Sequence, residues 1–233
     1  MSLNQSAWEQ EYQNPKLLIT ENEKPHAELV KFLKWLRKEK GVKDLAGWRV
    51  LDLGSGTGRN ANFLAEKGCD VVGFEYSPTA LKLAEQRAQE NNLKIDYQLR
   101  DIGAEYPLPD NSVDLVLDIT SSNSLDGEGR QIYLSEIKRV LKPGGYVLVR
   151  LLAKDGDKNA KWLLTNHPGT EADTYILPEV GLIERVFSRD DFNKFYGRVG
   201  AIEQLALVPH YTRLAGRIFK RNHWVAYIHK NES

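Results

Sequence analysis

The feature that most constrains the fold is a regular alternation of short apolar strands and amphipathic helices between residues 25 and 152. Helical patterns include Leu29–Leu36, Arg59–Lys67, a helix that begins after Ser77-Pro78, and Gly129–Leu141. Strand patterns are Trp48–Leu53, Asp70–Phe74, Lys94–Leu99, Val113–Ile119 and Tyr146–Leu152. Strands that alternate with helices over short connections build parallel βαβ units. The sequence therefore predicts an α/β fold with a doubly wound sheet.

The alternation stops after residue 152. Residues 153–187 mix charges, glycines and prolines, and they are too long for a plain connection, so we expect a functional insertion there. A helix is predicted over Ser188–Val199, followed by two closing strands, Ala201–Val208 and Trp224–Lys230. A basic linker with Arg213, Arg217, Lys220 and Arg221 is expected between these strands. A chain of 233 residues suits one domain, with residues 1–24 as an N-terminal extension.

Composition narrows the class of protein. The formal net charge is +0, so no global field favours nucleic acid or an anionic membrane. The single cysteine, Cys69, excludes an intrachain disulfide, and the polar N-terminus shows no secretory signal. The longest apolar stretch, Tyr146–Ala153, is short and contains Arg150. We expect a cytoplasmic protein without a membrane span, and the scattered histidines and single cysteine predict no metal site. The oligomeric state does not follow from the sequence.

The first strand ends in the loop VLDLGSGTGRN, residues 50–60, where an acid precedes three glycines on alternate positions. No Lys-Ser/Thr pair follows, so this is not a phosphate-binding P-loop. The dinucleotide fingerprint G-x-G-x-x-G/A would need a small residue at Arg59, whereas the third glycine is Gly58. A carboxylate at Asp52 would repel a pyrophosphate and attract an ammonium group. The loop therefore favours an adenosine-like ligand that is not anionic at this point.

Two more acids end the next two strands. Glu75 closes the second strand, where a carboxylate can accept hydrogen bonds from ribose hydroxyls. Asp101 follows the third strand, where it could meet an adenine amino group beside the apolar Ile102. Acids often end strands merely because strands end at the surface, but three consecutive examples are better explained by a shared ligand.

Four motifs in this order resemble the class I S-adenosylmethionine-dependent methyltransferases, and in particular the group of ubiquinone and menaquinone biosynthesis. They are VLDLGSGTGRN, VVGFEYSPTALKLA, LRDIGAEYPLPDNSVDLVLDI and EIKRVLKPGGYVLVR, within residues 46–152. The resemblance implies a seven-stranded sheet of order 3-2-1-4-5-7-6 with an antiparallel seventh strand. It also implies S-adenosyl-L-methionine as the cofactor.

The same resemblance assigns cofactor residues. Asp52 and Gly54–Gly58 (Gly54, Ser55, Gly56, Gly58) would hold the methionine part, and Asn60 belongs to the same motif. Glu75 would hold the ribose, with Tyr76 near the adenine and Asp101-Ile102 beside the base. Asp118-Ile119 would end the fourth strand beside the methyl group, and Lys142–Gly145 would be a structural turn.

The acceptor site is expected over Asp118–Ser124, including Asn123, together with the insertion 153–187. The motif of exocyclic-amine methyltransferases, [DNS]-P-P-[YFW], is absent after the fourth strand. Trp8 and Tyr12, four residues apart, could form a lid over the site or simply fix a helix to the domain. His167, His210 and Tyr211 are candidate general bases.

These expectations combine into an S-adenosylmethionine-dependent methyltransferase that acts on a small molecule by in-line displacement. The alternatives are a protein or RNA acceptor, or a relative that binds the cofactor without catalysis. A nicotinamide-dependent oxidoreductase is disfavoured by Gly58 and Arg59.

Overall fold

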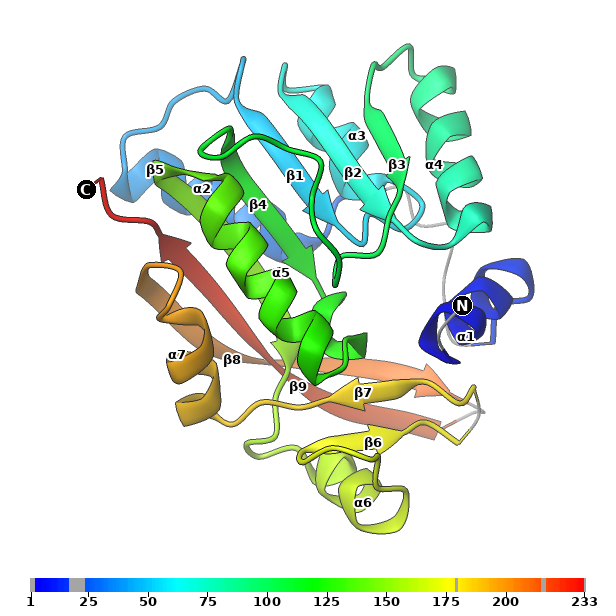
Figure 1. Ribbon diagram of the computed structural model, residues 1–233. Helices are drawn as coiled ribbons and strands as arrows, with labels where there is room; N and C mark the ends of the chain where they lie inside the picture. Colours follow the sequence, from blue (N-terminus) through cyan, green and yellow to red (C-terminus); the bar gives the residue numbers. More distant parts are fainter. Residues whose placement is uncertain (1–2, 17–23, 179, 215–216, 233) are drawn as a thin grey trace.

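The computed structural model describes residues 3–16, 24–178, 180–214 and 217–232. Its centre is a seven-stranded sheet of order β3-β2-β1-β4-β5-β9-β8 (Figure 1). The strands are β1 (Arg49–Leu53), β2 (Asp70–Glu75), β3 (Asp96–Leu99), β4 (Val113–Ile119), β5 (Leu141–Leu152), β8 (Ala201–Leu214) and β9 (Arg217–His229). The first five are parallel, and β9 runs antiparallel to both β5 and β8. The predicted strand order and the antiparallel seventh strand are confirmed.

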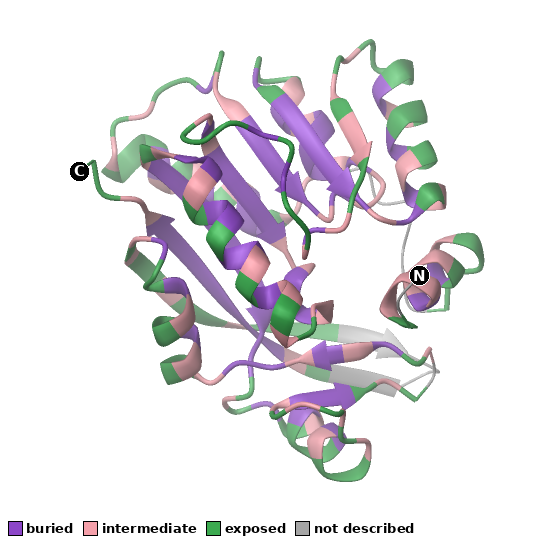
Figure 2. Cartoon of the chain, in the orientation of Figure 1, coloured by how far each residue is buried: buried purple, intermediate pink, exposed green. Residues whose placement is uncertain are grey.

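Helices cover both faces of the sheet. On one face lie α2 (Ala27–Glu39) and α3 (Arg59–Ala65), with α4 (Pro78–Glu90) beside α3. On the other lie α5 (Gly127–Val140) and α7 (Arg189–Tyr196), which pack on β4, β5 and β9. The strands between these layers are buried along most of their length (Figure 2). This double cover explains why the central strands read as continuous apolar runs and not as alternating ones.

The predicted helix starts are confirmed by their capping hydrogen bonds. Ser77 accepts from the Ala80 N–H at the start of α4, and Ser188 accepts from the Asp191 N–H at the start of α7. The helix expected from Gly129 begins at Gly127, because Asp126 caps it by accepting from the Gly129 N–H. In each case a short polar side chain satisfies a backbone donor that the first helical turn leaves free.

The insertion is ordered. It contains α6 (Lys158–Asn166) and a separate two-stranded sheet of β6 (Thr174–Ile176) and β7 (Ile183–Arg185). Tyr175, at the centre of β6, is fully buried and its hydroxyl donates to the Glu184 carboxylate at 2.7 Å. Glu171 pairs with Arg130 of α5, so the insertion is fixed to the main sheet's helical layer.

The prediction of a basic linker between the closing strands is wrong. Strands β8 and β9 continue through it as one long hairpin whose last described pair is Leu214 with Arg217. The strands were predicted from apolar runs alone, and the ends of the hairpin are polar, so the prediction stopped short of them. Arg221 turns inward, where its Nε donates to Asp157 at 3.1 Å and its Nη2 to the Tyr175 hydroxyl at 2.6 Å. The side chains of Arg213 and Arg217 lie outside the described residues.

The N-terminal segment forms α1 (Leu3–Gln13), which lies below α4 near the carboxyl end of β2 (Figure 1). Residues 17–23 of the predicted 1–24 extension lie outside the described residues. Within the described part, no helix combines the length and the apolar character that crossing a membrane requires.

Candidate functional site

The glycine loop is shaped by positions that only glycine fills comfortably. Gly54, Gly56 and Gly58 all have positive φ, at 68°, 55° and 80°. A Cβ on Gly54 would lie 2.3 Å from the Ser121 Oγ, and one on Gly58 would lie 2.2 Å from the Tyr97 hydroxyl. The alternate glycines therefore permit both the backbone turn and the close approach of neighbouring elements.

Two buried polar atoms in this loop region lack partners. The Asp52 Oδ2 and the Ser55 Oγ form no hydrogen bond with any of the described residues, although both residues are buried. Buried polar atoms are normally paired, and exceptions concentrate at functional sites. Burial raises the pKa of the Asp52 carboxyl to about 7, in opposition to the attraction of the Arg59 guanidinium. A bound ammonium group and a hydrogen-bond donor would satisfy what the protein leaves open.

Glu75 has a second task that the sequence did not reveal. Its Oε2 accepts from the Gly56 N–H, and its Oε1 accepts from the N–H groups of Tyr76 and Ser77, each at 2.9 Å. One carboxylate thus ties the end of β2 to the glycine loop. A carboxylate has about four lone-pair positions, so only about one remains for a ribose hydroxyl. Burial raises the pKa of Glu75 while the three backbone donors oppose that shift.

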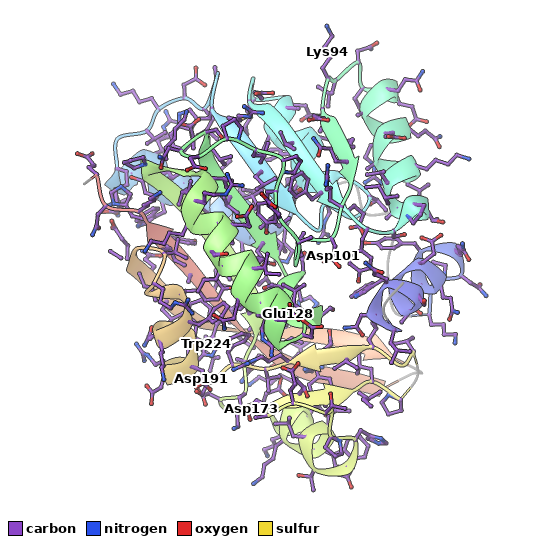
Figure 3. All side chains as sticks on the ribbon, in the orientation of Figure 1. Lys94, Asp101, Glu128, Asp173, Asp191 and Trp224 are labelled. Carbon is purple, nitrogen blue, oxygen red and sulfur yellow. The ribbon has the colours of Figure 1, made fainter. Side chains whose placement is uncertain are left out.

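Asp101 and Ile102 lie beyond β3, at the same edge (Figure 3 labels Asp101). Ile102 is buried, and the Asp101 Oδ1 accepts from the Gly103 N–H at 2.8 Å. The other oxygen, Oδ2, accepts from the Gln5 side chain of α1 at 3.1 Å. The oxygen expected to meet an adenine amino group is therefore also an anchor for α1. The Tyr76 hydroxyl is buried without a partner among the described residues.

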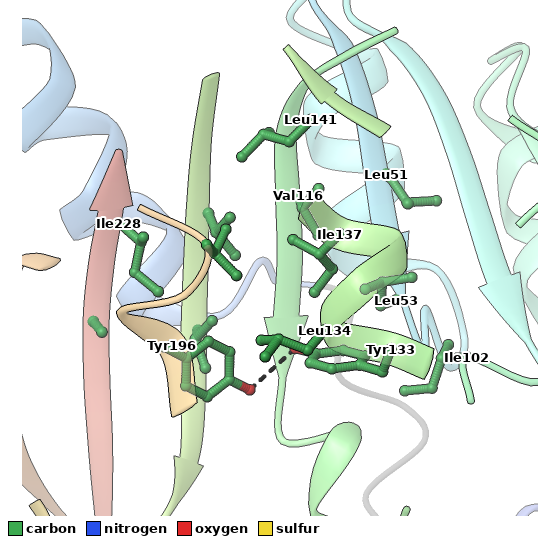
Figure 4. Packing of buried hydrophobic residues seen from close by; sticks show 14 of the residues in the cluster. Leu51, Leu53, Ile102, Val116, Tyr133, Leu134, Ile137, Leu141, Tyr196 and Ile228 are labelled. Atoms are coloured by element: carbon green, nitrogen blue, oxygen red, sulfur yellow. Dashed lines mark hydrogen bonds between the residues drawn. The ribbon is translucent and has the colours of Figure 1, made fainter. Parts of the chain in front are cut away.

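Asp118 is bonded within the protein. Its Oδ1 accepts from the Ser121 N–H at 2.9 Å, and its Oδ2 accepts from the Tyr133 hydroxyl at 2.6 Å and from the Ser122 hydroxyl. Tyr133 contacts Tyr196 of α7 through their hydroxyls, 3.1 Å apart (Figure 4). The acid at the end of β4 thus organises the loop that follows, and Ile119 is half-buried on the α2 face.

That loop approaches the glycine loop directly. The Ser121 hydroxyl reaches the Gly54 carbonyl at 3.4 Å. Thr120 has φ of 67°, an uncommon conformation for a β-branched residue, which is typical of functional sites. Asn123 is buried; its Oδ1 accepts from the Leu152 N–H at 3.1 Å, and its Nδ2 has no partner among the described residues.

Helix α1 packs over these strand ends. Glu9 accepts from the Ser77 hydroxyl at 2.5 Å and from the Thr79 hydroxyl at 2.6 Å, and Trp8 Nε1 donates to the Ser124 hydroxyl at 3.1 Å. A Cβ on Gly56 would lie 2.8 Å from the Tyr12 hydroxyl, so Tyr12 covers the glycine loop. Trp8 and Tyr12 thus lie at this edge of the sheet, and their role as a lid stays a prediction. The polar anchors Asn4, Gln5 and Glu9 were missed, because such residues are also typical of solvated helix faces.

The remaining predicted site residues lie in different parts of the molecule. Asn60 accepts from the His26 N–H at 2.9 Å and thereby fixes the start of α2. His167 ends α6 against Trp162, with ring centres 5.1 Å apart, and Tyr211 is 64% exposed on β8; neither hydrogen-bonds to the glycine loop. His210 is exposed on β8, with its ring centre 6.1 Å from that of His223. Among the described residues no group of histidine, cysteine and acids could hold a metal ion.

Comparisons with known proteins bear on this geometry. Residues 50–145 match the family model described as "Methyltransferase domain". The chain is 35% identical over 104 residues to a demethylmenaquinone methyltransferase of Tropheryma whipplei, which covers 45% of this chain and 41% of that protein. It is 29% identical over 112 residues to a tRNA N(3)-cytidine methyltransferase of Danio rerio, covering 45% and 32%. The chain thus spans less than half the length of either relative.

Solved structures extend the similarity of fold to the remainder of the chain. A methyltransferase from Methanosarcina mazei, described as SAM-dependent, aligns with a TM-score of 0.70 at 23% identity, covering 80% of this chain and 94% of that one. The 1,6-didemethyltoxoflavin-N1-methyltransferase of Burkholderia thailandensis, solved with S-adenosylhomocysteine, aligns with a TM-score of 0.66 at 15% identity, covering 98% and 88%. Together with the motifs and the strand order, these findings show that residues 50–145 belong to the class I S-adenosylmethionine-dependent methyltransferases.

Proposed function

We propose that this protein transfers a methyl group from S-adenosylmethionine to a small-molecule acceptor. The observation that carries the proposal is the pair of unpartnered buried atoms, the Asp52 Oδ2 and the Ser55 Oγ, beside a loop whose three glycines have positive φ. A loop of that shape leaves its backbone open to close approach by a ligand. The family of residues 50–145 supplies the ligand's chemical identity.

Within this proposal each residue has a definite task. Asp52 attracts the ammonium group of the cofactor's methionine part. The Arg59 guanidinium, whose charge also acts on Asp52, faces the carboxylate of that methionine part. Glu75 accepts from one ribose hydroxyl with its remaining lone pair. Tyr76 and Ile102 flank the adenine, and Asp101 exchanges its bond with Gln5 for one with the adenine amino group.

When bound, the cofactor supplies a methyl group on a positively charged sulfur. The protein then has to align the acceptor and exclude water. We assign alignment to the loop that Asp118 organises, with Asn123 and its unpartnered Nδ2 as a donor toward the acceptor. Helix α1, with Trp8 and Tyr12, excludes water from above the glycine loop. No described side chain is assigned the role of general base.

The test is calorimetry with S-adenosylhomocysteine and NAD, followed by an assay for S-adenosylhomocysteine release from a metabolite panel. Binding of S-adenosylhomocysteine in the micromolar range and none of NAD is expected. Glu75→Gln should weaken binding by about tenfold or more, because its amide would point a donor at the backbone N–H groups. Glu66→Gln, the same exchange at the exposed end of α3, is the matched control. Tight NAD binding without S-adenosylhomocysteine binding would refute the proposal.

The second candidate is an RNA acceptor, favoured by the similarity to the tRNA methyltransferase over 45% of this chain. Including bulk tRNA and protein fractions in the release assay separates the two. Methyl transfer to tRNA alone would replace the small-molecule proposal, whereas transfer to a metabolite alone would support it.

A further inference from the structure

One arginine and three histidines gather on the α2 face of the sheet, beside the carboxyl end of β5. They are His26, Arg150, His210 and His223, from the start of α2, from β5, from β8 and from β9. The ring centres of His210 and His223 are 6.1 Å apart, and the charge of Arg150 acts on all three histidines. Because Leu152 pairs with His223 and Arg150 pairs with Val225, strand alternation brings Arg150 and His223 to the same face. The function proposed above uses none of these four residues.

Arg150 is a buried cation without a carboxylate partner. It is 7% exposed, and its Nη1 donates to the Thr120 hydroxyl. Among the described residues no acid forms an ion pair with it, and the nearby Glu28 is paired with Lys31 at 2.8 Å. Burial lowers the pKa of Arg150 to about 10, so the guanidinium stays charged at neutral pH. A buried charge is costly unless a counter-charge joins it.

The histidines supply neutral N–H groups around that charge. His26 Nδ1 accepts from the Glu28 N–H at 3.2 Å, which leaves the ring proton on Nε2 as a donor. His223 is 4% exposed, and its Nδ1 has no partner among the described residues. Burial, with the charge of Arg150, lowers the pKa of His26 to about 3 and that of His223 to about 2.

Two further arginines act on these groups. Arg221 is paired with Asp157 at 3.1 Å, and the charge of Arg59 is opposed by Asp52. Arg150 is thus the positive charge here without an acid partner among the described residues, and one such charge among neutral donors matches a monoanion better than a dianionic phosphate.

The cluster adjoins the proposed reaction site. Thr120, the partner of Arg150, precedes Ser121, which packs against Gly54. The Thr120 N–H also donates to the Arg150 carbonyl at 2.8 Å. In open α/β sheets, ligands lie at the carboxyl ends of the strands, where β4 and β5 place this pair. The strained φ of Thr120 is held by the same contacts.

We propose, on the basis of the proposed function, that Arg150, His26 and His223 bind a carboxylate group of the methyl acceptor. The guanidinium provides the counter-charge and a charge-assisted hydrogen bond, and the imidazole N–H groups complete the carboxylate's coordination. The acceptor is therefore an organic acid, held by its carboxylate beside the loop after β4. His210, which is more exposed, borders the same group.

Histidine ring NMR tests this inference, because the chain has five histidines and two lie elsewhere. His167 packs against Trp162, and His229 stacks on Tyr146. The protein with S-adenosylhomocysteine is titrated with acetate, hexanoate and benzoate, with benzamide as the neutral counterpart of benzoate and orthophosphate as the dianion. We expect carboxylates to shift the resonances of His26, His210 and His223 saturably, leaving His167 and His229 unchanged. Arg150→Gln should raise the dissociation constant by about tenfold or more, and Arg198→Gln, on the exposed end of α7, should not.

The inference would be overturned if no carboxylate shifted the three histidine resonances, or if benzamide or orthophosphate shifted them as strongly as the carboxylates. It would also be overturned if Arg150→Gln weakened the binding of S-adenosylhomocysteine but not that of methylthioadenosine, which lacks a carboxylate. The last would assign the cluster to the cofactor. His223→Gln repeats the test if Arg150→Gln does not fold. Failure of the proposed function is seen separately, as absent S-adenosylhomocysteine binding, while carboxylate shifts persist.

Discussion

Two buried aspartates on neighbouring strands have opposite surroundings. Asp52 lies near the end of β1 and Asp118 near the end of β4, where Leu53 pairs with Asp118. Asp118 accepts from two hydroxyls and from backbone N–H groups of the following loop. Asp52, by contrast, has an oxygen without a partner among the described residues. The same residue type, equally buried, completes the protein's own structure at one strand end and leaves a ligand position at the other.

The largest expected effect comes from a steric clash between the loops that follow β1 and β4. In Gly54→Ala the new Cβ would lie 2.5 Å from the Ser121 Cβ, with φ at 68°. We expect a loss of about 3 kcal/mol in the free energy of unfolding and loss of S-adenosylhomocysteine binding. Urea denaturation and calorimetry measure both. Gly41→Ala, with a similar φ of 71° and no atom within 4 Å, is the control for backbone strain alone. Equal losses in both variants would show that the contact with Ser121 is unimportant.

The substitutions Asp118→Asn and Asp52→Asn should have different effects on the free energy of unfolding. Two hydroxyl donors lose a charged acceptor, so the free energy of unfolding should fall by about 2 kcal/mol. Asp52→Asn should not lower it, since no hydrogen bond to Oδ2 is lost among the described residues and a buried charge is removed. Asp52→Asn should instead weaken S-adenosylhomocysteine by about tenfold. Reversed effects would contradict the comparison.

The pH dependence of binding sharpens the same contrast. The Asp52 carboxyl has a pKa of about 7 without ligand, and an ammonium group requires its ionised form. The dissociation constant for S-adenosylhomocysteine should therefore fall about tenfold from pH 6 to pH 8, with a proton released on binding. Calorimetry in buffers of different ionisation enthalpy counts that proton. The Asp52→Asn variant should lack the dependence; a pH-independent wild type would exclude Asp52 as the group responsible.

The same raised pKa has a consequence for stability, with the opposite sign. A carboxyl whose folded pKa exceeds its unfolded value binds more protons when folded. Its contribution to stability is greatest below about pH 4 and is lost as pH rises toward 7. Without ligand, the midpoint of urea unfolding of the wild type should decline relative to Asp52→Asn over that window. Parallel profiles would argue against the raised pKa.

The smallest expected effect is that of Tyr196→Phe. Its hydroxyl lies 3.1 Å from that of Tyr133, at the outer end of the Asp118 network (Figure 4). We expect a loss of about 1 kcal/mol in the free energy of unfolding with unchanged cofactor affinity. Tyr211→Phe, at an exposed hydroxyl, should have no effect. A large change in affinity would mean that the network reaches the cofactor site.

The sequence predicted those elements of the fold that a local residue pattern identifies. The central strands, the caps Ser77 and Ser188, and the strand order followed from apolar runs, turn residues and family motifs. The β8–β9 hairpin did not, because its polar ends lack an apolar face. The cluster of Arg150 and three histidines was equally hidden: its members come from the start of α2 and from β5, β8 and β9, and they meet only in the folded chain. The role of each cofactor residue stays a prediction.

Glu75 has one more consequence. By accepting from Gly56, Tyr76 and Ser77, it gives an amide in an open glycine loop the same kind of protection as an amide inside a sheet. Hydrogen exchange at Gly56 should then require β2 to open as well, so the loop and the strand behave as one cooperative unit. A ligand that meets such a loop finds it already ordered, and the entropy of arranging it has been spent during folding.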